Sequence, residues 1–135
     1  MPTPELLVKN LKVSFAASKK ELIAVRGISY QLNQGEILAL VGESGCGKTV
    51  SALSILRLIQ EPPGKIVSGE ILFAGKDLLK LKKKELQDRR GKDIAMIFQD
   101  PMTSLNPYLT IADQMTQVVR EHEKTSRQAA RDRCL

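Results

Sequence analysis

Apolar residues fall into short runs along the chain, and in its first third these runs predict strands. Residues 6–15 (LLVKNLKVSF) show the mixed alternation of apolar and polar positions that is typical of a partly exposed strand. Residues 22–25 and 28–32 predict two shorter strands, with Gly27 as a turn or bulge between them. Because short loops join these runs, we expect antiparallel pairing.

Three further apolar runs predict additional strands. Residues 36–41 (EILALV) and 93–98 (DIAMIF) are mostly apolar, which is typical of strands that are buried in a parallel sheet. Residues 66–73 (IVSGEILF) predict another strand, interrupted by Gly69. Turns or polar connections are predicted at 16–21, 33–35 and 74–77.

Apolar residues at helical spacing predict two helices in the middle of the chain. Residues 50–59 (VSALSILRLI) predict a helix that ends before Pro62 and Pro63, since neither proline can continue it. Residues 78–90 predict a second helix, with Gly91 at its C-terminal stop.

Capping signals predict two more helices near the end of the chain. Thr110 and Asp113 form a near capping box, so a helix is expected to begin directly after Thr110. Thr125 and Gln128 repeat the signal for a last helix. No glycine, asparagine or proline ends that helix before Leu135, and we therefore expect the chain to be a fragment cut within a helix.

Composition indicates a water-soluble globular protein. Of the 135 residues, 42% are apolar and 27% are charged, and no apolar run approaches the roughly 20 residues of a membrane span. The N-terminus does not resemble a secretion signal, so a cytoplasmic location is the default. Cys46 and Cys134 make neither a disulfide framework nor a metal site, and the lone His122 is most simply a surface residue.

The net charge of +6 is concentrated in one segment. Between Lys80 and Lys92 there are seven basic residues and two acidic ones, Glu85 and Asp88. This segment is interpreted first as a solvated helix face. Contact with nucleic acid or with anionic lipid is the alternative, although the aromatic residues typical of single-strand nucleic-acid binding are missing.

The strongest chemical signal is a glycine-rich loop. Residues 42–49 (GESGCGKT) fit G-x-x-x-x-G-K-[ST], the phosphate-binding P-loop, between a predicted strand and a predicted helix. Glycines let successive N–H groups turn inward, and the helix points its positive end at the same place. Lys48 can reach the β- and γ-phosphates, and Thr49 can ligate Mg²⁺. The alternative, a glycine-rich turn with an incidental lysine, does not explain the flanking strand and helix.

A P-loop leaves the reaction open. A GTPase would need an N-K-x-D motif, and none is present. A small-molecule kinase would need an arginine-rich lid, for which the last helix is a weak candidate. Asp100 follows the apolar run 94–98 as a magnesium-binding aspartate would, but Gln99 intervenes.

Gln99 and its neighbours carry a specific resemblance. Residues 97–107 (IFQDPMTSLNP) resemble the Q-loop of ABC transporter ATPases, most closely the branch that serves dipeptide, oligopeptide and nickel importers. The GESGCGKT loop agrees with that branch. The resemblance implies an α/β P-loop NTPase fold: an antiparallel β subdomain (1–35), an incomplete RecA-like core through the Q-loop (36–109) and the start of a helical subdomain (110–135).

The resemblance also implies functional residues. Those expected to hold ATP are Phe15, Gly42, Glu43, Ser44, Gly45, Cys46, Gly47, Lys48, Thr49 and Val50. Thr49 and Gln99 would contact Mg²⁺, and Lys48 and Gln99 would be catalytic. Phe15 would stack on adenine, although Tyr30 is a rival aromatic and Phe15 could instead be a core residue. Val50 replaces a hydroxyl residue that many relatives place there, so one hydrogen bond should be missing.

The partners implied are a second ABC ATPase subunit, identical or related, and permease subunits that dock on the stretch from Asp100 to Pro107. A solute-binding protein would act indirectly, and no nucleic acid is expected. The location implied is peripheral, on the cytoplasmic side of the membrane.

The family's LSGGQ signature, second nucleotide motif and switch histidine are not found in the sequence, and His122 comes too early to be the switch. We therefore expect weak Mg-ATP binding, no meaningful turnover, and a marginal fold for residues 1–135.

Overall fold

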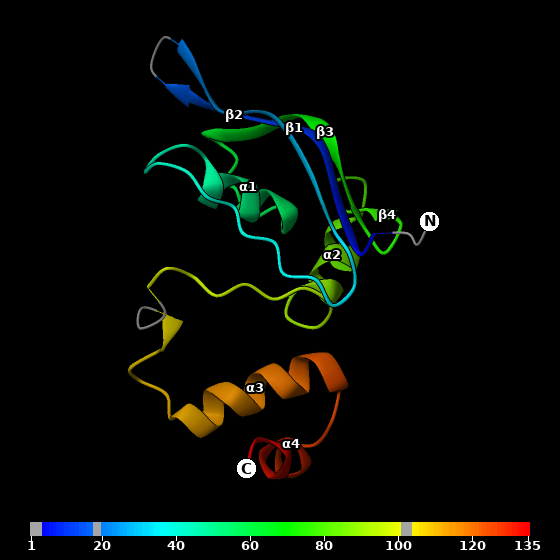
Figure 1. Cartoon of the computed structure of the whole chain (residues 1–135). Helices are drawn as coiled ribbons and strands as arrows, with labels where there is room; N and C mark the ends of the chain where they lie inside the picture. Colours follow the sequence, from blue (N-terminus) through cyan, green and yellow to red (C-terminus); the bar gives the residue numbers. More distant parts are fainter. Residues whose placement is uncertain (1–3, 18–19, 101–103) are drawn as a thin grey trace. The chain divides into compact units, whose positions relative to one another are not determined.

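An antiparallel sheet forms from the alternating runs of the first third and from the run that contains Gly69. In the computed structural model, which describes residues 4–17, 20–100 and 104–135, β1 (Leu6–Ala17) lies between β2 (Lys20–Leu32) and β3 (Gly64–Phe73). A short β4 (Lys76–Asp77) pairs with β3, where a turn was predicted (Figure 1). All pairings in this sheet are antiparallel, and the antiparallel pairing predicted for the first third is that of β1 with β2.

The chain divides into two units, Met1–Leu86 and Gln87–Leu135. The core of the first unit lies along the sheet. Its fully buried apolar side chains are Val8, Leu11, Val13, Ile71 and Leu78. The helix α1 (Lys48–Ile55) contacts β1 and β2, so the sheet supports the helix that follows the P-loop.

The two short strands predicted around Gly27 are a single strand. Gly27 has a φ of 94°, and the pairing with β1 shifts register there, from Leu11 opposite Ile28 to Lys12 opposite Arg26. The glycine is therefore a bulge within β2, one of the two alternatives predicted, and the strand continues past it because its neighbours on both sides stay paired with β1.

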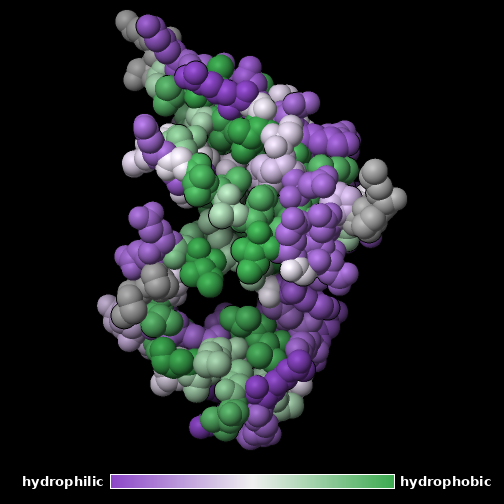
Figure 2. Space-filling view, in the orientation of Figure 1, coloured by the Kyte–Doolittle hydropathy of each residue, from purple (hydrophilic) through white to green (hydrophobic). Residues whose placement is uncertain are grey.

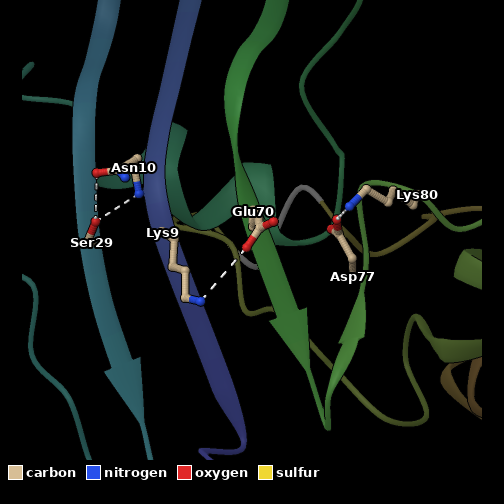
Figure 3. Close-up of polar contacts among 6 residues, drawn as sticks. All are labelled: Lys9, Asn10, Ser29, Glu70, Asp77 and Lys80. Atoms are coloured by element: carbon tan, nitrogen blue, oxygen red, sulfur yellow. Dashed lines mark hydrogen bonds and ion pairs between the residues drawn. The ribbon is translucent and has the colours of Figure 1, made fainter.

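A second irregularity lies between β1 and β3. Gly69, at a φ of 116°, sits where a Cβ atom would lie 2.7 Å from the Cα of Leu11, so only glycine fits. Polar contacts flank this point (Figure 3): the backbone N–H of Asn10 donates to Ser29 Oγ at 2.8 Å, and Lys9 Nζ lies 3.9 Å from a carboxylate oxygen of Glu70. The interruption predicted at Gly69 is a bulge.

The buried strand predicted at residues 36–41 is wrong. This stretch has no regular secondary structure, and it is exposed: Ile37 keeps 96% and Val41 90% of its accessible surface. Hydrophobic side chains gather over this segment in Figure 2. The physical reason is that a parallel strand needs hydrogen-bonded neighbours, and none of the described strands pairs with this stretch.

The strand predicted at residues 93–98 is wrong for the same reason. One isolated parallel bridge joins Arg90 to Ile94, and the rest of the run is irregular, with Ile97 90% exposed. Both stretches are apolar, but among the described residues no strand pairs with either of them, and the bridge at Ile94 is too short to make a strand.

The helices agree with prediction in type and differ at their ends. α1 begins at Lys48 and ends at Ile55, where residues 50–59 were predicted. The helix predicted over 78–90 is shorter, since residues 78–81 form turns before α2 (Lys83–Arg89), and Gly91 follows at a φ of 80°. The sequence boundary between the two units falls within α2, after Leu86.

The second unit contains two packed helices, α3 (Ile111–Glu123) and α4 (Arg127–Cys134). Thr110 caps α3 as predicted, accepting a hydrogen bond from the N–H of Asp113 at 3.1 Å. The cap of α4 is Ser126, not Thr125, because the Ser126 hydroxyl is the one that reaches a free N–H of the first turn.

Ion pairs join the two helices of this unit. Arg127 contacts Asp113, and Arg133 contacts Glu123, each at 2.6 Å. The Thr110 hydroxyl, and after it the Arg127 guanidinium, lower the pKa of Asp113. Within the described part of the chain, every helix is too short or too polar to span a lipid bilayer.

Candidate phosphate-binding site

The P-loop leads directly into α1 through two glycines in the left-handed region. Gly45 has a φ of 80° and Gly47, the N-cap of α1, a φ of 96°. A Cβ atom on Gly47 would lie 2.5 Å from the carbonyl oxygen of Ala24 in β2, whereas one on Gly45 would meet nothing within 4 Å. The loop is therefore seated against β2 at Gly47 and open at Gly45.

Lys48 is held on the loop it follows. Its ammonium donates to the carbonyl oxygens of Gly42 at 2.7 Å and Glu43 at 2.8 Å. These two bonds fold the side chain back along the loop, so that the charge sits beside the residues that precede the helix. The ammonium of Lys48, which the sequence predicts to bind phosphate, therefore lies at the P-loop.

The first turn of α1 is electrostatically open to an anion. It contains no acidic residue, and its N-cap is a glycine without a capping side chain. The positive end of the helix dipole is therefore not neutralised from within the turn. Thr49 lies exposed on this turn, where its hydroxyl is accessible to a ligand.

Behind that turn, two buried serines anchor α1. The hydroxyl of Ser51 donates to the carbonyl of Lys48 at 2.8 Å, and that of Ser54 donates to the carbonyl of Val50 at 2.7 Å. Hydroxyls that bond within the helix can be buried at little cost, so the small face of α1 can approach the sheet closely.

The remaining P-loop residues are exposed. Glu43 and Ser44 lie in the open part of the loop, and the N–H of Cys46 donates to the carbonyl of Glu43 at 3.3 Å. The thiol sulfur of Cys46 lies 3.6 Å from Lys48 Nζ. Among the described residues, no cluster of His, Cys, Asp and Glu has the size needed to hold a metal ion.

A cavity of about 600 Å³ adjoins the loop. Its walls come from the P-loop, including Gly45, Gly47 and Lys48, and from β2 on either side of Ala24. Sequence reasoning missed this second wall. Its residues are Leu22, Ile23, Ala24, Val25, Arg26 and Ile28. The alternating pattern predicted strands there, but it contained no signal for their contact with Gly47.

The two candidate aromatics lie in the sheet. Phe15 pairs with Leu22 on β2 and with Gly64 on β3, and one of its ring carbons lies 2.9 Å from the point where a Cβ on Gly64 would be. It is not among the residues that line the cavity beside the loop. The buried hydroxyl of Tyr30 has no hydrogen-bond partner among the described residues, and burial raises its pKa.

Gln99 belongs to the second unit, while the P-loop belongs to the first. It is exposed, in the irregular stretch after Ile94. Its predicted contact with a Mg²⁺ ion bound at the P-loop therefore stays a prediction. Of the predicted permease-facing stretch from Asp100 to Pro107, residues 101–103 lie outside the described residues, as do residues 18–19 of the predicted connection 16–21.

Residues 25–134 match the family model described as "ABC transporter". The chain belongs to the ABC transporter family. Over 130 residues it is 52% identical to the oligopeptide transport ATP-binding protein OppD of Bacillus subtilis, and 50% identical to the dipeptide transport ATP-binding protein DppD of the same organism. Each alignment covers 96% of this chain, which spans 36% and 39% of those relatives.

Solved structures of ABC cassettes have the same fold. The chain is similar to a dimeric ATP-binding cassette, MJ0796, in a post-hydrolysis state bound to ADP and Pi, with a TM-score of 0.76 at 21% identity. The match covers 95% of this chain and 53% of that one. The fold is thus that of part of an ABC cassette, as the sequence predicted, although residues 36–41 and 93–98 do not form strands and only Ile94 makes a bridge.

Proposed function

We propose that the P-loop binds Mg-ATP, and that the chain belongs to an ATPase that drives the import of peptides or of a related small solute such as nickel. The observation that carries the proposal is the geometry at the start of α1. Gly47 is seated on β2 in the left-handed region, and Lys48 is held on the loop at the start of a helix turn that has no capping side chain and no acidic residue. The names of the peptide-transport relatives support the solute class.

The residues present fit a magnesium nucleotide. The amides of the loop and of the first turn suit phosphate oxygens, and the exposed Thr49 hydroxyl suits Mg²⁺. The apolar wall of β2 beside the loop offers a surface for the base or ribose. When bound, Mg²⁺ would add positive charge beside the β- and γ-phosphates.

Each predicted site residue has a proposed role. Lys48 would offset charge on the γ-phosphate, and Gln99 would contact Mg²⁺ and orient the attacking water. Phe15 would stack on adenine. The loop residues 42–50 would hold the phosphates, with Val50 contributing its backbone N–H alone.

Partners and organisation are proposed in the same way. A second ATPase subunit would complete the site, and permease subunits would dock on the stretch from Asp100 to Pro107 at the cytoplasmic side of the membrane. A solute-binding protein would act through the permease. The proposed subdomains are residues 1–35, 36–109 and 110–135.

Nucleotide binding tests the proposal directly. A fluorescent ATP analogue is titrated into the chain and into Lys48→Ala, with Lys65→Ala as the matched control, because Lys65 is an exposed lysine of β3 away from the loop. Lys48→Ala removes hydrogen bonds from a charged donor, which contribute about 1.5–3 kcal/mol to binding, so its Kd should be about 10- to 150-fold higher. Equal affinities for the two variants would contradict the proposed site.

Magnesium dependence tests the role of Thr49. The isosteric Thr49→Val should bind nucleotide with an affinity that no longer responds to added Mg²⁺. A wild-type magnesium response in this variant would remove Thr49 from the metal site.

Turnover is expected to be low for residues 1–135, because the signature and second nucleotide motif of the family are not in this sequence. Phosphate release is measured at saturating ATP. Release that increases with the amount of purified chain and disappears in Lys48→Ala would contradict this expectation.

A further inference from the structure

Basic residues around the start of α2 form a surface that the nucleotide site does not use. We define the basic face as Arg57, Lys80, Lys82, Lys83 and Lys84. The Arg57 guanidinium donates to the carbonyl of Leu81 at 2.9 Å, which places it next to the lysines, and Arg57 and Lys83 line one groove. All five residues are exposed.

The charge of this face is only partly balanced. Lys80 pairs with Asp77 at 3.0 Å (Figure 3) and is still 77% exposed. The carboxylate of Glu85 accepts from the backbone N–H of Lys82 at 2.8 Å, so it caps α2. Glu61 lines the groove of Arg57 and Lys83. The three consecutive lysines of the face make no ion pair with a described residue.

We propose that the basic face lies against the anionic headgroups of a lipid bilayer. Clustered lysines on one exposed surface are attracted to such headgroups, and each one strengthens binding about fivefold. The inference uses no residue of the proposed ATP site and stands independently of it.

The observations favour lipid over nucleic acid. No aromatic residue occurs between Lys76 and Lys92 to stack on bases. Four of the five cations are lysines, which act as point charges and lack the planar fork that reads base edges. Leu79 and Leu81 are partly accessible beside them, which suits the boundary between headgroups and acyl chains.

Vesicle co-sedimentation of the whole 135-residue chain tests the proposal. Vesicles of phosphatidylcholine with 30 mol% phosphatidylserine are compared with phosphatidylcholine alone. We expect preference for the anionic vesicles that weakens steeply with salt. The triple variant Lys82→Gln, Lys83→Gln, Lys84→Gln should bind about a hundredfold more weakly, and replacement of the same lysines by arginine should preserve binding.

The matched control removes three charges elsewhere in the first unit, through Lys9→Gln, Lys20→Gln and Lys65→Gln. Both triples have the same net charge, and circular dichroism checks that both are folded. The proposal is overturned if the two triples lose affinity equally, if neutral vesicles bind as well as anionic ones, or if a DNA duplex at the same salt binds more tightly than the anionic vesicles.

Discussion

The contact between Gly47 and β2 makes a sharp prediction about the two left-handed glycines of the P-loop. Both Gly45→Ala and Gly47→Ala place a Cβ in the left-handed region, which costs about 1–2 kcal/mol. Only in Gly47→Ala does that Cβ lie 2.5 Å from a backbone carbonyl oxygen, that of Ala24. The backbone of Ala24 cannot rotate away from this Cβ as a side chain could. Overpacking should therefore cost Gly47→Ala a further ~1–3 kcal/mol of unfolding free energy, which is what extra methylenes cost in a packed core.

The free energy of unfolding should therefore fall by about 1–2 kcal/mol in Gly45→Ala and by about 2–5 kcal/mol in Gly47→Ala. Replacing glycine by alanine also restricts the unfolded chain, but this effect is shared and cancels in the comparison. Urea unfolding followed by circular dichroism measures both variants.

Equal losses in the two variants would refute the reasoning, since the Ala24 contact is the difference between them. A second readout localises the effect. Hydrogen exchange of the N–H groups of α1 and β2 should accelerate in both variants, and more strongly in Gly47→Ala than in Gly45→Ala.

Three further predictions concern local features. The pairing of β3 with β4 leaves a two-residue turn, Ala74 at a φ of 46° and Gly75 at 77°, so Ala74→Asn should raise the unfolding free energy by up to about 1 kcal/mol in urea titrations. Burial raises the pKa of Asp77, but hydrogen bonds to its carboxylate outweigh burial, so the net pKa is lowered. The carboxylate therefore stabilises the fold above pH 3.8, its ordinary pKa, and this stabilisation is lost as the pH falls further. Asp77→Asn should not show this loss when unfolding is followed in an acid titration. Ser126→Ala should destabilise α4 by about 0.5–2 kcal/mol, while Thr125→Ala should have little effect; equal melting temperatures would contradict the assigned cap.

Local signals predicted much of the fold. The alternation of residues 6–15 predicted β1, the interruption at Gly69 marked a true bulge, and Thr110 was identified as a cap. These features depend on backbone angles and on side chains a few residues apart, which a sequence displays directly. β4 was missed because two residues are too few to show a period.

The failures come from pairing and from contacts between distant residues. Residues 36–41 have the polarity of a buried strand, but polarity does not supply the neighbour that a strand needs, and Ile37 remains exposed. The wall of β2 beside the P-loop depends on the approach of Gly47 to Ala24, which are far apart in the chain. The P-loop motif could be recognised in the sequence because it consists of eight consecutive residues, and its role as a phosphate site stays a prediction.

The bonds of Lys48 to its own loop bear on what the site selects. The ammonium has three N–H donors, and two of them already bond to carbonyl oxygens at 2.7 and 2.8 Å, so a ligand can take the third donor or exchange its own acceptor for a carbonyl. In either case an anionic acceptor gains more than a neutral one, because it is attracted by the charge of the ammonium. In the proposed role of Lys48, the site would therefore favour phosphate groups over neutral hydroxyl compounds before any base or sugar is recognised.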